Sequence, residues 1–129
     1  MSVNFSNILK QCHLFAGTSE ADRQLLLSIS KTRDCNRGEL LFEEGQVADG
    51  FYVVVSGKVK VFKLSPDGRE RILHVIHPGS SFADAAIFDD GVFPAFAMSI
   101  DQSSLLFFPK DQFLQLLHRQ PQLAINMIA

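Results

Sequence analysis

Apolar positions along the first thirty residues follow the spacing of helices. The spacing is broken at Ala16-Gly17, and Thr18-Ser19 stands where a helix cap is expected. The apolar positions on either side of this break are Ile8, Leu9, Leu25, Leu26 and Ile29. The pattern therefore predicts two short helices at the N-terminal end of the chain.

From Cys35 to about Pro109 the pattern changes to short β-branched and aromatic runs, each closed by a turn signal. These runs predict antiparallel strands over Glu39–Phe42, Phe51–Val55, Lys58–Leu64, Glu70–Ile76, Phe96–Ile100 and Ser104–Phe108. In Lys58–Leu64, lysines alternate with apolar residues, which predicts a half-buried strand with its lysines in water.

Helical spacing returns after Pro109 and predicts a helix from about Asp111 to His118, stopped by Gln120-Pro121. Another helix is expected from Leu123, and it stays apolar to Ala129, as expected of a helix that is cut short or of one that packs on a partner. We expect a mainly β fold: a small antiparallel jelly roll (double-stranded β-helix) flanked by N- and C-terminal helices.

The composition limits the size and the partners of the chain. Its 129 residues fit one domain, and 12 Lys+Arg against 14 Asp+Glu leave no basic excess for nucleic-acid binding. No apolar stretch approaches the ~20 residues of a membrane span and no signal peptide is recognisable, so a cytoplasmic protein is expected. Cys12 and Cys35 are too few for a disulfide scaffold and are expected to be reduced.

Three segments, Arg37–Gly45, Phe51–Val59 and Pro78–Phe82, resemble the strand-and-glycine framework of cyclic-nucleotide-binding-like domains. The segment Leu9–Phe15 is similar to bacterial regulators of the catabolite activator and fumarate-nitrate reductase regulator superfamily, most like the dissimilatory nitrate respiration regulator branch. The resemblance implies that residues 1–129 are the effector-sensing domain of a transcription regulator, ending at the start of a dimerisation helix. It also implies a homodimer through that helix, and DNA contact only through a domain absent from this chain.

In members that bind cyclic nucleotides, a short helix, an Arg and a Glu hold the cyclic phosphate and the ribose. Here Ala83 stands where Gly is expected, Asp84 where Glu is expected, and Pro94-Ala95 in place of the Arg and its neighbour. No Lys or Arg occurs between Arg71 and Lys110, so a phosphate would meet aspartates without a cation. We therefore expect no cyclic AMP binding here. The cations on neighbouring strands that could still reach in are Lys60, Arg69 and Arg71.

Apolar and aromatic residues replace the phosphate site and favour a flat, apolar effector. The predicted effector pocket consists of Phe82, Ala83, Asp84, Ile87, Phe88, Phe93, Phe96 and Met98. The alternative is that these side chains simply fill the core of a phenylalanine-rich roll.

The branch that the chain resembles is associated with haem and nitric oxide sensing. His13 stands at the position of one histidine of a pair and Cys12 replaces the other, so both are candidate haem ligands. Alternatively, both only pack or solvate the end of the first helix. His74 and His77 lie three apart on a predicted strand and point to opposite faces, so no metal site is expected from them.

No nucleophile, base and orienting acid form a recognisable set, so an enzyme is not expected. The leading hypothesis is an effector-binding sensor domain that responds to haem and nitric oxide, or to a small apolar effector, rather than to cyclic AMP. The alternative is a stand-alone, ligand-free jelly roll that acts as a dimerisation or docking module.

Overall fold

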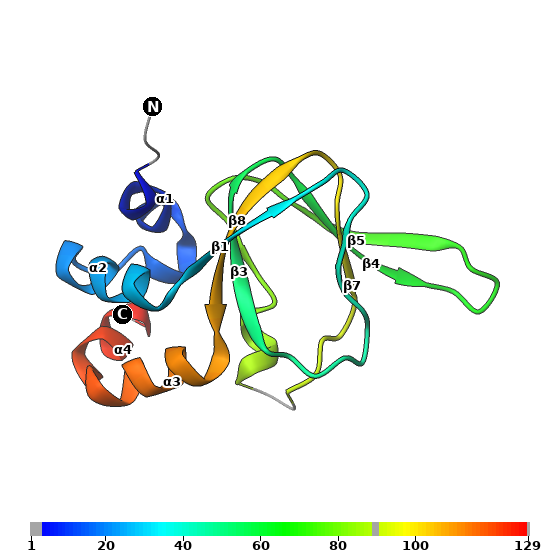
Figure 1. Ribbon diagram of the computed structural model, residues 1–129. Coiled ribbons are helices and arrows are strands. Elements are labelled where there is room, and N and C mark those ends of the chain that lie inside the picture. Colours follow the sequence, from blue (N-terminus) through cyan, green and yellow to red (C-terminus); the bar gives the residue numbers. More distant parts are fainter. Residues whose placement is uncertain (1–3, 89–90, 129) are drawn as a thin grey trace.

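The computed structural model describes residues 4–88 and 91–128 (Figure 1). Its helices are α1 (Phe5–Gln11), α2 (Glu20–Ile29), α3 (Lys110–Arg119) and α4 (Pro121–Ile128), with short 3₁₀ helices η1 (His13–Phe15) and η2 (Asp84–Ile87). Its strands are β1 (Lys31–Cys35), β2 (Leu40–Phe42), β3 (Gly50–Ser56), β4 (Val59–Leu64), β5 (Glu70–Ile76), β6 (Ser81–Phe82), β7 (Phe96–Ser99) and β8 (Ser103–Pro109).

Two antiparallel four-stranded sheets, ordered β1-β8-β3-β6 and β2-β7-β4-β5, form the roll. The helices gather on the outer side of the first sheet, whereas the β4–β5 hairpin projects from the opposite side of the molecule (Figure 1). The predicted fold, a mainly β jelly roll flanked by helices at both ends of the chain, is confirmed.

Local sequence explains where the helices begin. Ser19 and Asp22 form a capping box at the start of α2, in which each side chain accepts a hydrogen bond from the other residue's backbone N–H. Pro121 is the first residue of α4, where its missing N–H costs no hydrogen bond. The predicted break at Gln120-Pro121 is therefore also the start of the next helix.

The sequence did not predict strands β1 and β6. Strand β1 carries mostly polar residues and only Cys35 is buried, so it has no apolar alternation, although it pairs with β8 along its whole length. Strand β6 has two residues. Both are edge strands, held by their backbone hydrogen bonds to one neighbour.

The prediction of a lysine face for residues 58–64 is wrong beyond Val61. Phe62 lies on the same face as Lys60 and is only 3% exposed, whereas Leu64 is 45% exposed. Phe62 is covered because its ring stacks on Phe96 at 5.4 Å between ring centroids and the Lys60 amine lies 5.1 Å from its centre.

The first sheet is buried on both faces by two aromatic clusters. On the helix side, Phe51 of β3 stacks on Phe108 of β8, and rings from η1 and α3 cover them: Phe15 and Phe113. On the inner side, the next residue of β3, Tyr52, stacks on Phe82. Because side chains alternate between the two faces of β3, Phe51 packs against the helix layer and Tyr52 packs inside the roll.

Candidate functional site

The segment after β6 occupies the place of the predicted phosphate-binding turn. Ala83 has φ +68°, the only positive φ of a non-glycine residue in the described ranges. An L residue there costs roughly 1–2 kcal/mol relative to glycine. The backbone therefore adopts the turn that the resemblance implies although the expected glycine is absent, and η2 follows with Ala86 and Ile87 buried.

The charges at this turn do not favour an anion. Asp84 is the first residue of η2, Pro94 is exposed and Ala95 is buried, so the expected arginine position holds no cation. Burial raises the pKa of the nearby Cys12 thiol, and the Asp84 carboxylate adds to that rise. The negative charge of Asp84 would also oppose a bound phosphate.

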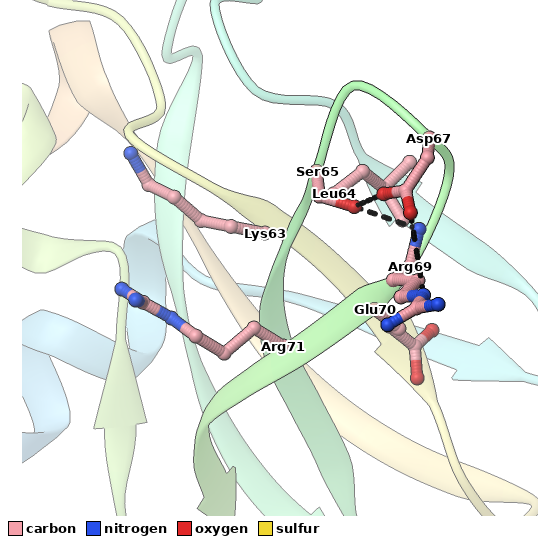
Figure 2. A pocket seen from close by; sticks show the side chains of 7 residues that line it. All are labelled: Lys63, Leu64, Ser65, Asp67, Arg69, Glu70 and Arg71. Carbon is pink, nitrogen blue, oxygen red and sulfur yellow. Dashed lines mark hydrogen bonds and ion pairs between the residues drawn. The ribbon is translucent and has the colours of Figure 1, made fainter.

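The three cations that the sequence analysis kept as possible partners of a phosphate lie on the β4–β5 hairpin. Lys60 pairs with Glu70 at 2.9 Å, and Arg69 pairs with Asp67 at 3.3 Å. Arg71 makes no ion pair within the described residues, and Figure 2 shows it extending from the hairpin on the same side as its cross-strand partner, Lys63. An open hollow of about 490 Å³ lies beside the hairpin turn. It is lined by Lys63, Leu64, Ser65, Asp67, Arg69, Glu70 and Arg71.

A cation that the sequence analysis missed, Arg33 of β1, reaches the aromatic interior. Its Nη1 donates to the Tyr52 hydroxyl at 2.9 Å, and its Nη2 lies 3.7 Å from a carboxylate oxygen of Glu39. Burial raises the pKa of Tyr52 against the opposing effect of this guanidinium. The sequence offered no signal for Arg33, because its strand lacks apolar alternation. Its charge is already balanced by Glu39.

The predicted pocket residues do not line one cavity in the described part of the chain. Phe82 and Phe93 lie inside the roll, whereas Phe88 is 55% exposed and faces Phe113 of the helix layer at 6.1 Å. Phe96 and Met98 lie on the outer face of β7, because Ala97 between them points into the core. The interior is filled by rings: Phe93 stacks on Phe42 with centroids 3.7 Å apart.

An apolar groove lies instead between the helices and the end of η2. It measures about 270 Å³ and is lined by Leu14, Phe88, Leu117, Ala124, Ile125, Met127 and Ile128. None of the described residues that line it is charged, and Ile125 and Ile128 of α4 are 52% and 86% exposed. Phe88 is the one residue that it shares with the predicted pocket. Such a groove accepts a small apolar molecule.

The two candidate haem ligands have different surroundings. Cys12 is fully buried, and its raised pKa disfavours the thiolate that binds iron, whereas His13 is exposed. Neither residue lines the apolar groove. No group of three or more His, Cys, Asp and Glu residues that could hold a metal occurs in the described ranges. Cys12 and His13 therefore do not fit haem as a pair of ligands to one iron.

Comparison with known proteins agrees with this architecture. The model of the family described as "Cyclic nucleotide-binding domain" matches residues 32–120. The chain belongs to the cyclic nucleotide-binding domain family. It is 31% identical over 121 residues to the "Cyclic AMP receptor protein" of Thermus thermophilus, covering 94% of this chain and 56% of that protein.

Similar domains have been solved as separate structures. The sensor domain of the transcriptional regulator DNR from Pseudomonas aeruginosa has a TM-score of 0.83 and 32% identity, over 96% of this chain and 83% of that one. The N-terminal domain of a transcriptional regulator from Streptomyces coelicolor A3(2) has a TM-score of 0.86 and 30% identity, over 94% and 85%.

These relatives confirm the predicted family. The specific nitrate respiration branch stays a prediction, although the DNR sensor domain is among the similar structures. This cyclic nucleotide-binding domain spans about half the length of the curated regulators that it matches. Among the described residues, no helix is long and apolar enough to cross a membrane.

Proposed function

We propose that this domain is the effector-sensing part of a bacterial transcription regulator and that its effector is a small apolar molecule rather than a cyclic nucleotide. The observation that carries the proposal is the location of the apolar groove, which lies beside α4 and not at the predicted effector pocket. Stacked ring pairs, Phe42 with Phe93 and Tyr52 with Phe82, occupy the interior of the roll, whereas the apolar groove lies against α4, the last described element of the chain.

Charge supports the same choice of effector. A cyclic phosphate beside η2 would lie near the Asp84 carboxylate, and Arg33, which reaches the aromatic interior, is already held by Glu39 and Tyr52. Moving Arg33 to an anion would break both contacts. Binding of a charged nucleotide would therefore start from an unfavourable electrostatic balance.

The groove places an effector directly against α4. Leu14 belongs to η1 on one wall, and Ile125 and Ile128 belong to α4 on the other. A ligand that fits the groove better in one position of α4 shifts the helix toward that position. In a full-length regulator, we infer that this shift would pass into a dimerisation helix and then to a DNA-binding domain.

Haem with nitric oxide is the other effector that the resemblance implies. Because neither Cys12 nor His13 lines the apolar groove, we assign no haem to the groove, and the exposed His13 stays a candidate axial ligand elsewhere on the surface. The docking-module alternative requires no ligand at all. It predicts that the groove takes up no small molecule.

The test uses the neutral fluorophore N-phenyl-1-naphthylamine and cyclic AMP. We expect saturable fluorescence enhancement by the domain and at least about a tenfold loss of affinity in Ile125→Glu, which places a charge in the groove at a half-exposed position. Calorimetry with cyclic AMP should show no micromolar binding. Micromolar cyclic AMP binding, or fluorophore affinity unchanged in Ile125→Glu, would overturn the proposal.

A further inference from the structure

The outer face of the sheet β2-β7-β4-β5 is apolar, although no described helix covers it (Figure 1). Cross-strand pairing places Leu40, Met98 and Val75 in one row across the strands, interrupted by Lys60. The next row is Phe96, Phe62 and Ile72. An antiparallel sheet with one solvated face normally carries polar residues there, so this face has the composition of a surface that is covered in the working protein.

Exposure confirms that the face is open in the isolated domain. Leu40, Ile72 and Val75 are 38%, 51% and 40% exposed. A hollow of about 330 Å³ lies on this face, and its apolar lining residues are Ile72, Met98 and Ile100. Its volume is sufficient for one or two apolar side chains of a partner. The face is well separated from the groove at α4, which lies on the helix side of the roll.

The charges around the hollow decide what kind of partner fits. Two cations border it, Arg37 and Lys60, and Lys60 is neutralised by Glu70 at 2.9 Å. Arg37 makes no ion pair with any described residue. A second copy of this face would bring another Arg37 guanidinium, whereas the Glu70 carboxylate is already paired with Lys60, so self-association does not supply the charge that Arg37 needs. A partner with its own carboxylate would balance it.

We propose that this outer face docks an acidic amphipathic segment of another protein, whose apolar side chains enter the hollow and whose carboxylate pairs with Arg37. An amphipathic helix laid in an apolar groove is a common form of such recognition. The hairpin turn itself, Ser65 to Gly68, is polar, which disfavours insertion of the hairpin into a membrane.

The test uses a fluorescein-labelled peptide with leucines at helical spacing flanked by glutamates, and a matched peptide with lysines in place of the glutamates. Fluorescence anisotropy should show micromolar binding of the glutamate peptide and at least about tenfold weaker binding of the lysine peptide. Equal binding of both peptides would overturn the proposal, because charge would then play no part.

Variants separate this face from the apolar groove. Ile72→Glu and Arg37→Glu should each weaken binding of the glutamate peptide by at least about tenfold, and Ile125→Glu in α4 should leave it unchanged. Because Ile72 and Arg37 are both exposed, we expect the variants to keep the parent's thermal unfolding midpoint. Loss of peptide binding in Ile125→Glu alone would overturn the assignment to the outer face.

Two further outcomes are distinguished in the same experiment. Light scattering that shows a dimer converted to a monomer by Ile72→Glu would identify a second copy as the occupant and overturn the proposal. Sedimentation of the domain with anionic phosphatidylglycerol vesicles, abolished by Ile72→Glu, would identify a membrane instead. Failure of the peptide test leaves the effector groove untouched, because Ile72→Glu should bind N-phenyl-1-naphthylamine as the parent does.

Discussion

The two sheets of the roll both carry apolar residues on their outer faces, but helices cover only one of them. On the first sheet, Phe51 and Phe108 are fully buried under rings from η1 and α3. On the second, Ile72 and Leu40 are open to solvent. Similar apolar patterns therefore have different consequences. One face stabilises the domain, and the other is available for binding.

The largest expected effect is on the free energy of unfolding, for a substitution in the covered outer face of the first sheet. Phe108→Ala should lower the free energy of unfolding by roughly 3–5 kcal/mol, because Phe108 is fully buried and contacts Phe15, Phe51 and Phe113. Ile72→Ala in the open face should change it by less than about 0.5 kcal/mol. Urea unfolding followed by circular dichroism measures both. Similar losses in the two variants would mean that the outer face of the second sheet also stabilises the isolated domain.

The next effect concerns the helix that borders the groove. Gly17 lies so close to α4 that an added Cβ would be 2.3 Å from the Asn126 carbonyl oxygen, and Asn126 Nδ2 also donates to Asp22 at 2.9 Å. Gly17→Ala should therefore displace α4 and lower stability by about 1–3 kcal/mol. Hydrogen exchange should show faster exchange of the α4 amides.

The matched control for Gly17→Ala is Gly38→Ala, beside the open sheet. No atom lies within 4 Å of the Cβ position at Gly38, but its φ of +81° is strained for alanine. This variant should lose about 1–2 kcal/mol of overall stability while hydrogen exchange in α4 stays slow relative to global unfolding. Local opening of α4 in Gly38→Ala, or none in Gly17→Ala, would contradict the role of the close contact between Gly17 and Asn126 in holding α4.

Much of the fold that underlies this comparison could be predicted from the sequence. Alternation and turn signals predicted six strands close to their observed bounds, and helical spacing predicted the helices at both ends of the chain. Strand β1 was missed because an edge strand can be held by backbone pairing alone, without an apolar face. That omission also hid Arg33, the cation that reaches the aromatic interior.

The candidate site was less predictable than the fold. Composition showed that residues 82–98 lack cations and, apart from three aspartates, are mostly apolar. It did not show which face each side chain takes, so Phe88, Phe93 and Met98 were placed together although they lie in three different parts of the molecule. The groove at α4 is formed by segments far apart in sequence, which no local pattern reveals.

The smallest expected effect is the pH dependence of the helix layer. Hydrogen bonds from Ser6, Gln24 and Arg23 lower the pKa of Glu20 from its ordinary 4.5 to about 2. A carboxylate whose pKa is lowered by folding stabilises the folded state above its unfolded pKa, and this contribution is lost as the pH falls from about 4.5 toward 2. Stability should therefore decrease across this window.

Glu20→Gln should make that decrease shallower, because the amide does not titrate. Ser6→Ala removes the largest cause of the lowered pKa and should bring the acid loss of stability to a narrower window nearer pH 4.5. Thermal unfolding midpoints between pH 6 and pH 2 measure both slopes. If the parent and Glu20→Gln lost stability in parallel, Glu20 would not contribute to holding α1 and α2 over the covered sheet, and burial of the aromatic rings alone would account for the attachment of these helices.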